Sequence, residues 1–324
     1  MKKYVIGIDV GGTNIVTALS DFNGNVLFKT KVPTEAFKGY KTTIYRIKEQ
    51  IENVLKNKGV TVDEVAGIGI GVPGLIDVES GMCYFSGNLG DEWQNVNIRE
   101  DLRSYFDVPI FLDNDVNVAA LGEKYFGAAR NSKDFIYITI GTGIGSAIIA
   151  DGRMIRGHRF CAGEFGHLTV DKNGPQCTCG NIGCIEAIAS APAIARRIKE
   201  KINAGRKSIM PELAGGVDRI SAKILSEAYD KGDELAVEIM KETGEWLGIA
   251  IAGYINIINP ELFIIGGGVS RAGERLLNYV REEVNKRAMK IQKETCKIIT
   301  AEQLDEAGMM GAIAAILEYL NILK

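Results

Sequence analysis

Hydrophobic and polar positions alternate in a way that predicts strands and helices along the whole chain. Residues 4–28 form three short apolar runs separated by Gly11-Gly12-Thr13 and by Asn23-Gly24, and the Asn-Gly pair favours a β-hairpin. Apolar residues at helical spacing predict a helix over residues 42–57. Two buried strands are then expected in VAGIGIGVPG and PIFLDNDVN, followed by a helix through AALGEKYFG.

The same pattern begins again in the middle of the chain. The segment FIYITIGTGIGSAIIADGRMI repeats the order strand, Gly/Thr turn, strand, Asp-Gly turn, strand, which indicates a structural duplication of residues 4–28. Strands and helices that alternate in two related halves predict an α/β protein with a cleft between two lobes.

The second half of the chain is predicted to be mainly helical. We expect helices over residues 186–200 and 221–258, with Ser221 and Asp233 as N-caps. The strand LFIIGGG should lead into a helix around residues 273–289, and GMMGAIAAILEYL should form a final helix. Residues 203–219 are the one stretch expected to be a long loop.

Composition and charge narrow the class of protein. The 324 residues suffice for two domains, and 46% hydrophobic with 24% charged residues is typical of soluble globular proteins. The net charge is -3, from 38 basic and 41 acidic side chains that are interspersed, so we expect neither a nucleic-acid partner nor a membrane partner. The chain shows no bilayer-length apolar run and no signal peptide, and its six cysteines fit a reducing compartment. We therefore expect a cytoplasmic protein.

Three Gly-rich turns are candidates for binding phosphate groups: residues 9–13 (DVGGT), 141–145 (GTGIG) and 266–268 (GGG). Glycine lets backbone N–H groups approach a phosphate closely, although each turn alone is equally compatible with a structural role. Dinucleotide and Walker A motifs need a helix after the turn, whereas β-rich sequence follows the first two turns here. These two turns are thus predicted to be hairpin clamps for a nucleoside triphosphate lying across a cleft. Asp9 could hold the water shell of a magnesium ion, or could simply cap its turn.

A candidate metal site lies within residues 163–186. Cys177, Cys179, Cys184 and His167 supply the three thiolates and one imidazole of a tetrahedral zinc site. Such a closed site would be structural and would hold the nearby Glu164 and Glu186, whose carboxylates could bind hydroxyl groups. The C-x-C-x4-C spacing is less common than C-x2-C, and the alternative is three reduced cysteines that pack as small apolar side chains.

A candidate general base lies at the end of the strand PIFLDNDVN. Phosphoryl transfer to a hydroxyl group needs a residue that accepts the hydroxyl proton, and Asp115 is placed to do so. The alternative is that Asp113, Asn114 and Asp115 only cap the following helix, because Asn-Asp is a common helix start. The residues by themselves leave both interpretations open.

Six motifs together resemble the ROK family of sugar kinases and repressors: DVGGT, NDVNVAALGE, ITIGTGIGSAIIADGRMIRG, GEFGHLTV, CTCGNIGCIEA and LFIIGGG. They cover nearly the whole chain, and GEFGHLTV with CTCGNIGCIE is most similar to the bacterial glucokinase branch. The resemblance implies a two-lobed actin-like ATPase fold of the hexokinase/Hsp70/actin type, with duplicated β-hairpin phosphate clamps and an interlobe cleft. We expect a small lobe from residues 1–116 and 308–324, and a large lobe from residues 117–307 that carries the zinc-binding sugar loop.

The resemblance also implies an activity and its residues. It implies an ATP-dependent glucokinase in which Asp115 is the general base and His167 binds structural zinc through one ring nitrogen and sugar through the other. The implied sugar-binding residues are Asn88, Asn114, Asp115, Glu164, His167 and Glu186. The residues implied for ATP with magnesium are Asp9, Gly11, Gly12, Thr13, Asn14, Gly141, Thr142, Gly143, Gly145, Gly267 and Gly268. The family also suggests a homodimer or a dimer of dimers.

Two other functions stay open within the same family. The first is a kinase for another sugar such as N-acetylmannosamine, fructose or allose, or one that uses polyphosphate as donor. The second is a sugar-responsive repressor. Such repressors carry an additional N-terminal helix-turn-helix domain, and because the first phosphate motif here begins at residue 9, we expect no such domain.

Overall fold

The computed structural model describes residues 1–304 and 306–323, and it divides into two compact units. Unit 1 comprises Met1–Asn131, Arg156–Ala162 and Glu302–Lys324, and unit 2 comprises Ser132–Ile155 and Gly163–Ala301. Each unit contains its own sheet and its own hydrophobic core.

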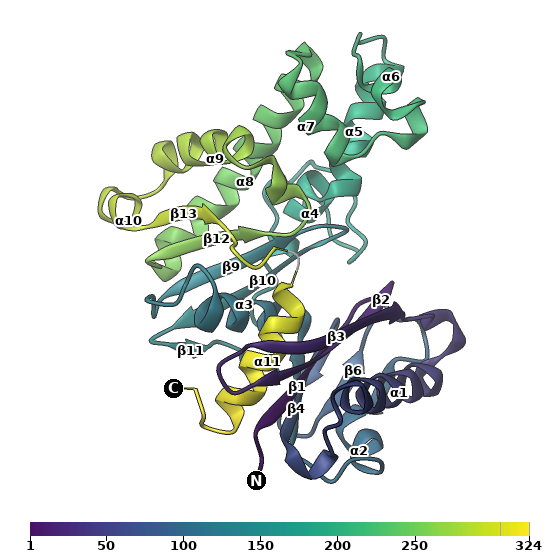
Figure 1. Ribbon diagram of the computed structural model, residues 1–324. Coiled ribbons are helices and arrows are strands. Elements are labelled where there is room, and N and C mark those ends of the chain that lie inside the picture. The colour runs from purple at the N-terminus through teal and green to yellow at the C-terminus, as the bar shows by residue number, and fades with distance from the viewer. Residues whose placement is uncertain (305, 324) are drawn as a thin grey trace. The chain divides into compact units, whose positions relative to one another are not determined.

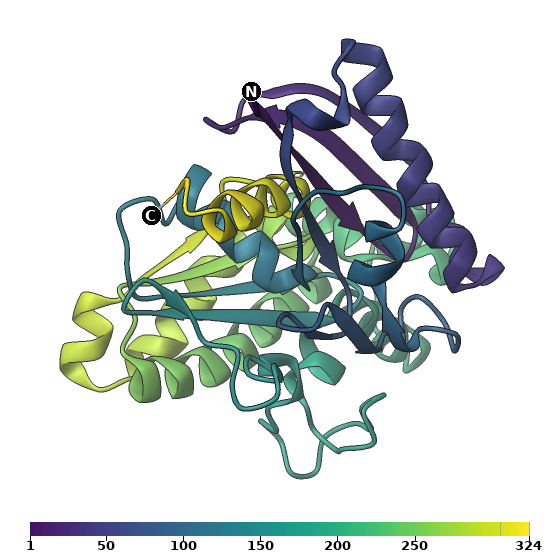
Figure 2. The same cartoon turned by 90° about the horizontal axis from the view of Figure 1, so that it is seen from below.

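The sheet of unit 1 has the strand order β3-β2-β1-β4-β8. Strands β1, β2 and β3 pair antiparallel, as predicted from the Gly-rich and Asn-Gly turns, whereas β4 and β8 run parallel to β1. Figures 1 and 2 show helix α1 on one side of this sheet and α11 on the other. The bounds are β1 Tyr4–Val10, β2 Asn14–Asp21, β3 Val26–Pro33, β4 Val65–Val72, β8 Ile110–Asn114, α1 Tyr40–Lys58, α3 Asp115–Phe126 and α11 Ala307–Tyr319.

Alternating isoleucine and glycine residues give this sheet two different faces. In β1 and β4 the isoleucines belong to the core that includes α1, while the glycines between them face α11. A Cβ atom at Gly69 would lie 2.0 Å from the carbonyl oxygen of Ala312, and one at Gly7 would lie 2.5 Å from Ile313. Since successive strand residues point to opposite faces, the Ile-Gly pattern allows α11 to pack directly against the strand backbones.

Replacing Gly311 in α11 with alanine is expected to destabilise the protein. A Cβ atom at this position would lie 1.9 Å from the carbonyl oxygen of Val118 in α3, and backbone cannot move away as a flexible side chain can. The cost should be about 3 kcal/mol, measured by urea denaturation. Gly253→Ala is the matched control, because no atom lies within 4 Å of its Cβ position outside its own helix. That substitution should stabilise by about 0.4–1 kcal/mol, and equal stability of the two variants would contradict the packing described.

The sheet of unit 2 repeats the arrangement, with the order β11-β10-β9-β12-β13. Again the first three strands of the set pair antiparallel and the last two run parallel to the first. The predicted duplication and the α/β fold with two related halves are therefore confirmed. Helices α8 and α9 pack together in this unit (Figure 1). The bounds are β9 Phe135–Ile140, β10 Ile144–Ala150, β11 Arg153–Met154, β12 Leu262–Gly266, β13 Lys297–Thr300, α8 Glu234–Ile258 and α9 Glu274–Arg287.

The helical part of unit 2 differs in detail from the prediction. The helix expected over residues 186–200 is two helices, α4 (Ile185–Ala189) and α5 (Ala191–Asn203), because Ser190 ends one and its side chain caps the next. The stretch 221–258 likewise divides into α7 (Ala222–Asp230) and α8. Asp233 caps α8 as predicted, but the Ser221 side chain makes no capping hydrogen bond.

Two further segments depart from the sequence-based expectation. Residues 203–219 are not a plain loop, since they contain α6 (Met210–Ala214) and a short 3-10 helix. Asp233 orders this segment by accepting hydrogen bonds from Ser208 Oγ and Ile209 N. In unit 1 a small antiparallel sheet of β5, β6 and β7 was not predicted. The remaining bounds are β5 Leu75–Asp77, β6 Met82–Phe85, β7 Gln94–Asn97, α2 Ile98–Arg103 and α10 Lys290–Thr295.

The predicted lobe boundaries differ from the division into units. Helix α3, assigned from the sequence to the large lobe, packs on α11 within unit 1, so that unit extends to Asn131. Lys324, the end of the predicted small lobe, lies outside the described residues.

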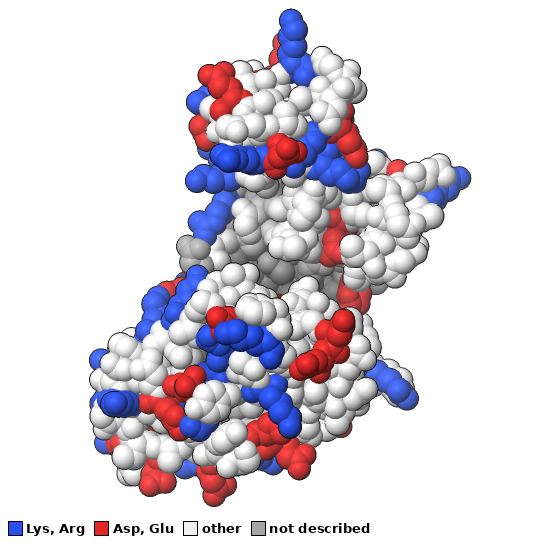
Figure 3. Space-filling view, turned by 90° about the vertical axis from the view of Figure 1, so that its right-hand side faces the viewer, with Lys and Arg blue, Asp and Glu red and all other residues white. Residues whose placement is uncertain are grey.

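Acidic and basic side chains are interspersed on the face shown in Figure 3. No helix in the described part of the chain is both long and apolar enough to cross a membrane.

Candidate active site

Asp9 and Asp115, two of the carboxylates predicted to be functional, lie at one end of the sheet in unit 1. Asp9 in β1 is in register with Gly71 in β4, and Gly71 is in register with Asp113 in β8. Gly308, in the first turn of α11, lies against Asp9, because a Cβ atom there would be 2.4 Å from the carboxylate carbon. Because β1, β4 and β8 are parallel, Asp9 and the segment that follows β8 lie at the same end of the sheet, where these strands have their C-terminal ends.

The electrostatic environment of Asp9 and Asp115 favours their protonated forms. Burial raises the pKa of Asp9 to about 7, and the negative charge of Asp115 adds to that increase. Burial likewise raises the pKa of Asp115 to about 6, although hydrogen bonds from backbone N–H groups oppose it. Asp115 nevertheless keeps part of its surface accessible, so its carboxylate can meet a substrate. A partly buried carboxylate with a raised pKa is a better proton acceptor than an ordinary surface aspartate.

If Asp115 accepts a proton during turnover, the rate should depend on pH in a specific direction. Only the ionised carboxylate can accept a proton, so kcat/KM should fall at acidic pH, by about tenfold per unit once the group is protonated. The midpoint of this decrease should lie between about pH 6 and 7. Because Asp9 and Asp115 interact, the apparent pKa describes the two carboxylates together and not either residue alone. Initial rates measured across pH test this. An unperturbed aspartate would leave the profile flat down to about pH 5, and that result would contradict the assignment.

Asn114 has a structural role that the sequence left open. Its Oδ1 accepts hydrogen bonds from Val116 N at 2.9 Å and Asn117 N at 3.4 Å, so it is the N-cap of α3. Its Nδ2 donates to the carbonyl oxygen of Gly74 at 3.0 Å. The helix-capping interpretation is therefore correct for Asn114. One amide hydrogen remains for the predicted contact with a sugar hydroxyl.

The first Gly-rich turn is held tightly while its tip stays accessible. Gly11 N donates to Asn14 O at 2.9 Å, and Thr34 binds the turn through its hydroxyl group and its backbone N–H. Gly12 and Thr13 are exposed. Asn88, also exposed, lies beside them, since a Cβ atom at Gly12 would be 3.1 Å from the Asn88 carbonyl oxygen. The structure thus brings Asn88 to the first turn.

The second and third Gly-rich turns lie together in unit 2. The turn between β9 and β10 closes with a hydrogen bond from Gly141 N to Gly143 O at 2.9 Å, and leaves Thr142 exposed and Gly145 in β10. Gly267 has φ +81, and a Cβ atom there would lie 2.5 Å from the carbonyl oxygen of Ile140 at the end of β9. Only glycine fits that position, and Gly268 beside it is exposed.

His167, Cys177, Cys179 and Cys184 form a cluster whose geometry fits a metal ion. Their candidate ligand atoms all lie within 4.8 Å of one another. The sulfurs of Cys179 and Cys184 are 3.7 Å apart, and Cys177 Sγ is 3.8 Å from His167 Nδ1. Tetrahedral zinc with ordinary bond lengths would give about 3.8 Å between sulfurs and about 3.6 Å between sulfur and nitrogen. The donor set and spacing therefore suit a metal, as predicted, better than three apolar packing residues.

Of the predicted sugar-binding residues in unit 2, His167 belongs to this cluster, and Glu164 and Glu186 lie next to it. His167 directs Nδ1 at the cluster, and its Nε2 lies 3.8 Å from the exposed Glu164 carboxylate. Glu186 is more constrained, because its Oε2 accepts a hydrogen bond from Ile144 N at 2.8 Å and its Oε1 lies 3.9 Å from Cys177 Sγ. A Cβ atom at Gly143 would come within 2.6 Å of Glu186 Oε2. Glu186 therefore links the cluster to the second Gly-rich turn, a contact that the sequence did not predict.

Of the predicted sugar-binding residues, Asn88, Asn114 and Asp115 belong to unit 1, and Glu164, His167 and Glu186 belong to unit 2. Within unit 1, a hydrogen-bonded network of Asp113, Asn117 and Arg156 next to Asp115 was not predicted from the sequence. The i, i+4 spacing of Asp113 and Asn117 after a strand was an available signal, whereas nothing local pointed to Arg156.

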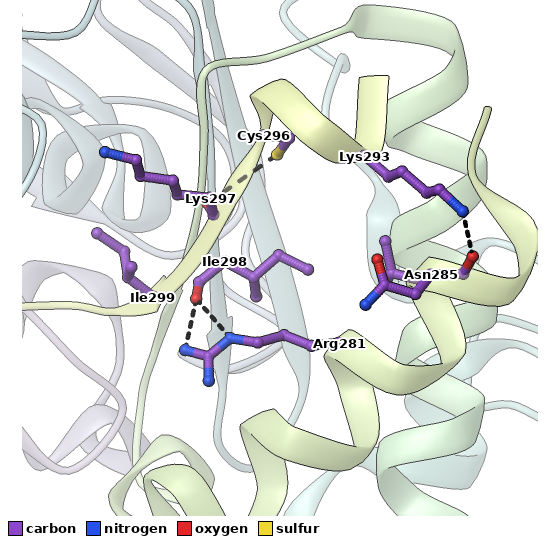
Figure 4. Close-up of a pocket in the computed structure, with 8 residues that line it drawn as sticks. Arg281, Asn285, Lys293, Cys296, Lys297, Ile298 and Ile299 are labelled. Carbon is purple, nitrogen blue, oxygen red and sulfur yellow. Dashed lines mark hydrogen bonds between the residues drawn. The ribbon is translucent and has the colours of Figure 1, made fainter. Parts of the chain in front are cut away.

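A cavity of about 340 Å³ lies in unit 2 between α9, α10 and β13 (Figure 4). It contains none of the predicted site residues. Arg281 donates to the Ile298 carbonyl oxygen, and Lys293 Nζ donates to the Asn285 carbonyl oxygen at 2.7 Å. Because its lining includes none of the residues predicted for catalysis, phosphate binding or sugar binding, this cavity is not the candidate active site.

The sequence profile of the ROK family matches residues 5–318, and the chain belongs to this family. A glucokinase of Thermotoga maritima is 39% identical over 320 residues, which cover 99% of both chains. A xylose repressor of Caldicellulosiruptor bescii is 36% identical over 97% of this chain and 78% of the repressor. The crystal structure of a ROK family glucokinase from Streptomyces griseus, in complex with glucose and AMPPNP, is 32% identical over 97% of this chain and 98% of that one, with a TM-score of 0.81. The family resemblance and the actin-like ATPase fold are therefore confirmed, while kinases and repressors are similarly close.

Proposed function

We propose that this protein is an ATP-dependent hexose kinase that phosphorylates glucose at its 6-hydroxyl group. The observation that carries this proposal is the Asp115 carboxylate, which is partly accessible at the end of β8 and has a pKa raised to about 6. The identity of 39% to a glucokinase and the similarity to a glucokinase structure with glucose support the choice of substrate.

In the proposed reaction, Asp115 accepts the proton of the sugar 6-hydroxyl as that oxygen attacks the γ-phosphorus of ATP. The new bond joins the sugar oxygen to phosphorus, the bond from phosphorus to the β–γ bridging oxygen breaks, and ADP leaves with that electron pair. Asn114 orients Asp115 by capping α3, and its free amide hydrogen contacts the sugar. A positioned base of this kind contributes about 10²–10⁴-fold to the rate.

The Gly-rich turns are proposed to hold the triphosphate. Backbone N–H groups at Gly12, Thr13, Thr142 and Gly143 would approach its oxygens, with Gly267 and Gly268 nearby. Asp9 would hold the water shell of a magnesium ion, which neutralises charge on the phosphates. At neutral pH this pairing also favours the ionised form of Asp9, a carboxylate that burial disfavours.

The Cys–His cluster is proposed to bind structural zinc and to support the sugar-binding residues. Zinc on Nδ1 of His167 would fix the ring so that Nε2 faces the sugar beside Glu164. Glu164 is the freer of the two glutamates and would accept hydrogen bonds from sugar hydroxyls. Glu186 would contribute through the oxygen that does not bind Ile144 N.

A coupled ADP-release assay across a panel of sugars and donors tests the proposal. We expect the highest kcat/KM with glucose and ATP, and lower values with N-acetylmannosamine, fructose, allose and with polyphosphate as donor. Preference for another sugar would overturn the glucose assignment but not the kinase assignment. Absence of ADP release with every sugar would overturn the kinase assignment.

The 36% identity to a xylose repressor supports a second candidate, a sugar-responsive regulator without turnover. A selection of bound sequences from a random DNA pool, with and without sugar, separates the two functions. Sugar-dependent DNA binding together with no phosphoryl transfer would favour the regulator. The proposed kinase should release ADP and should select no DNA sequence from the pool.

As suggested by the family, the protein should sediment as a homodimer or a dimer of dimers.

A further inference from the structure

One short segment of the chain contributes a cation to the interior of unit 1. Arg156–Ala162 belongs to unit 1, although the chain on both sides of it belongs to unit 2. The segment closes on itself through a hydrogen bond from Ala162 N to Arg156 O at 3.0 Å. The side chain of Arg156 reaches Asp113, the residue that precedes Asn114 at the end of β8.

Asp113 is the buried centre of a hydrogen-bonded network in which both of its carboxylate oxygens have partners. Its side chain is only 2% exposed. Its Oδ2 accepts from Arg156 Nε at 2.9 Å and lies 2.8 Å from the same residue's Nη2. Its Oδ1 accepts from Asn114 N at 2.7 Å and from Asn117 Nδ2 at 2.9 Å. Arg156 supplies the positive charge that balances the Asp113 carboxylate. This pairing matters because a buried carboxylate without a counter-charge is strongly unfavourable.

The same network fixes the turn that carries the proposed base. Asp113 holds the residue before Asp115 through the Asn114 N–H group, and it holds the residue two positions after Asp115 through the Asn117 side chain. Asn114 in turn caps α3 at Val116 and Asn117. Among the described residues, the Asp115 carboxylate is held within this turn by local backbone N–H contacts. The position of its carboxylate therefore depends on the turn and, through Asp113, on Arg156.

We propose that Arg156 is a positioning residue for phosphoryl transfer, acting through Asp113 to fix the β8–α3 turn and hence the carboxylate of Asp115. This inference rests on the proposed function. It concerns a residue outside the predicted catalytic and binding sets, in a loop that ends two residues before Glu164. Misplacement of a reacting group by about 1 Å can cost about 10²-fold in rate, so the effect should fall on turnover rather than on sugar binding.

Steady-state kinetics of Arg156→Met, Arg156→Lys and a matched control test the proposal. Arg156→Met should lower kcat by about 10²-fold and change KM for glucose by less than about threefold. Arg156→Lys keeps the positive charge but loses the contact of two guanidinium nitrogens with Asp113, so its kcat should lie between those of Arg156→Met and the wild type. Arg130→Met is the control, because it removes an arginine–carboxylate pair of unit 1 in which both side chains are about half exposed, and kcat should stay unchanged.

If Arg156→Met does not fold, the double variant Arg156→Met with Asp113→Asn leaves no unpaired buried charge and should show the same loss of kcat. Unchanged kcat in folded Arg156→Met or in the folded double variant, or a rise in KM for glucose together with a loss of kcat that Arg156→Lys does not relieve, would overturn the proposal. Hydrogen exchange of the Val116 and Asn117 amides is measured alongside. Their exchange should accelerate in Arg156→Met and not in Arg130→Met, even if the wild-type protein phosphorylates no sugar. Lack of activity with accelerated exchange would thus refute the kinase function alone, whereas unchanged exchange would refute the network.

Discussion

Replacing Asp115 with asparagine is expected to lower kcat by about 10²–10⁴-fold while glucose binding is largely retained. Asparagine has nearly the same shape as aspartate but cannot accept the proton of the sugar hydroxyl. Its oxygen can still accept the hydrogen bond that Val116 N donates to Asp115, so the turn before α3 should persist. Turnover is measured by coupled ADP release, and glucose binding by calorimetry on the same preparation.

The control for this prediction is Asp107→Asn, which removes the charge of an exposed aspartate in the same unit. It should leave kcat unchanged. If Asp115→Asn turned over within about tenfold of the wild-type rate, a barrier change of only about 1.4 kcal/mol, Asp115 would not be the base. If glucose binding were lost together with turnover, Asp115 would be mainly a sugar-binding residue.

Replacing Cys177 with serine is expected to remove the metal and weaken sugar binding. The wild-type protein should contain about one zinc ion per chain, and the variant should contain far less. Mutation of a residue that only hydrogen-bonds to a metal ligand already lowers metal affinity by about 10–100-fold, so loss of a ligand itself should lower it at least as much. Cys177 Sγ lies against both His167 Nδ1 and Glu186. Loss of the metal should therefore release His167 and disturb the second Gly-rich turn through Glu186. Elemental analysis measures the metal, and calorimetry measures glucose binding.

Cys296→Ser is the matched control for the metal, because Cys296 lies in unit 2 but outside the cluster. Its zinc content and glucose affinity should equal those of the wild type. Protein purified without chelators that contains no zinc would favour the alternative that the three cysteines pack as apolar residues. Zinc loss without any change in glucose affinity would confirm the metal but refute its support of the sugar-binding residues.

The fold was largely predictable because its strongest signals are local. The Asn23-Gly24 turn and the Gly-Thr turns marked antiparallel hairpins, and their recurrence marked the duplication that the two sheets show. The regular Ile-Gly alternation in β4 predicted a buried strand, although not that its glycines admit α11. The break at Ser190 was missed because apolar spacing continues across it, whereas the extended backbone of Ser190 and its capping hydrogen bond separate the two helices.

The candidate site was less predictable because its contacts are non-local. Asn114 could be placed before a helix, but its two roles could not be separated without the hydrogen bonds to Val116 and Gly74. Arg156 lies 43 residues from Asp113, and Glu186 lies 42 residues from Ile144. No spacing rule connects such pairs, since they depend on how the strands and their connections fold back. The His–Cys cluster was the exception, because its three cysteines lie close together in the sequence.

Identification of the phosphorylated product tests the central claim most directly. The folded, metal-loaded protein is incubated with glucose and ATP labelled at the γ-phosphate, and the product is analysed for the position of the label. The proposed mechanism predicts that the label moves to the 6-hydroxyl of glucose, with one ADP formed for each glucose 6-phosphate, and that Asp115→Asn nearly abolishes this transfer. Label found only in inorganic phosphate, or only in unreacted ATP whichever hexose is supplied, would contradict the assignment of this ROK protein as a sugar kinase.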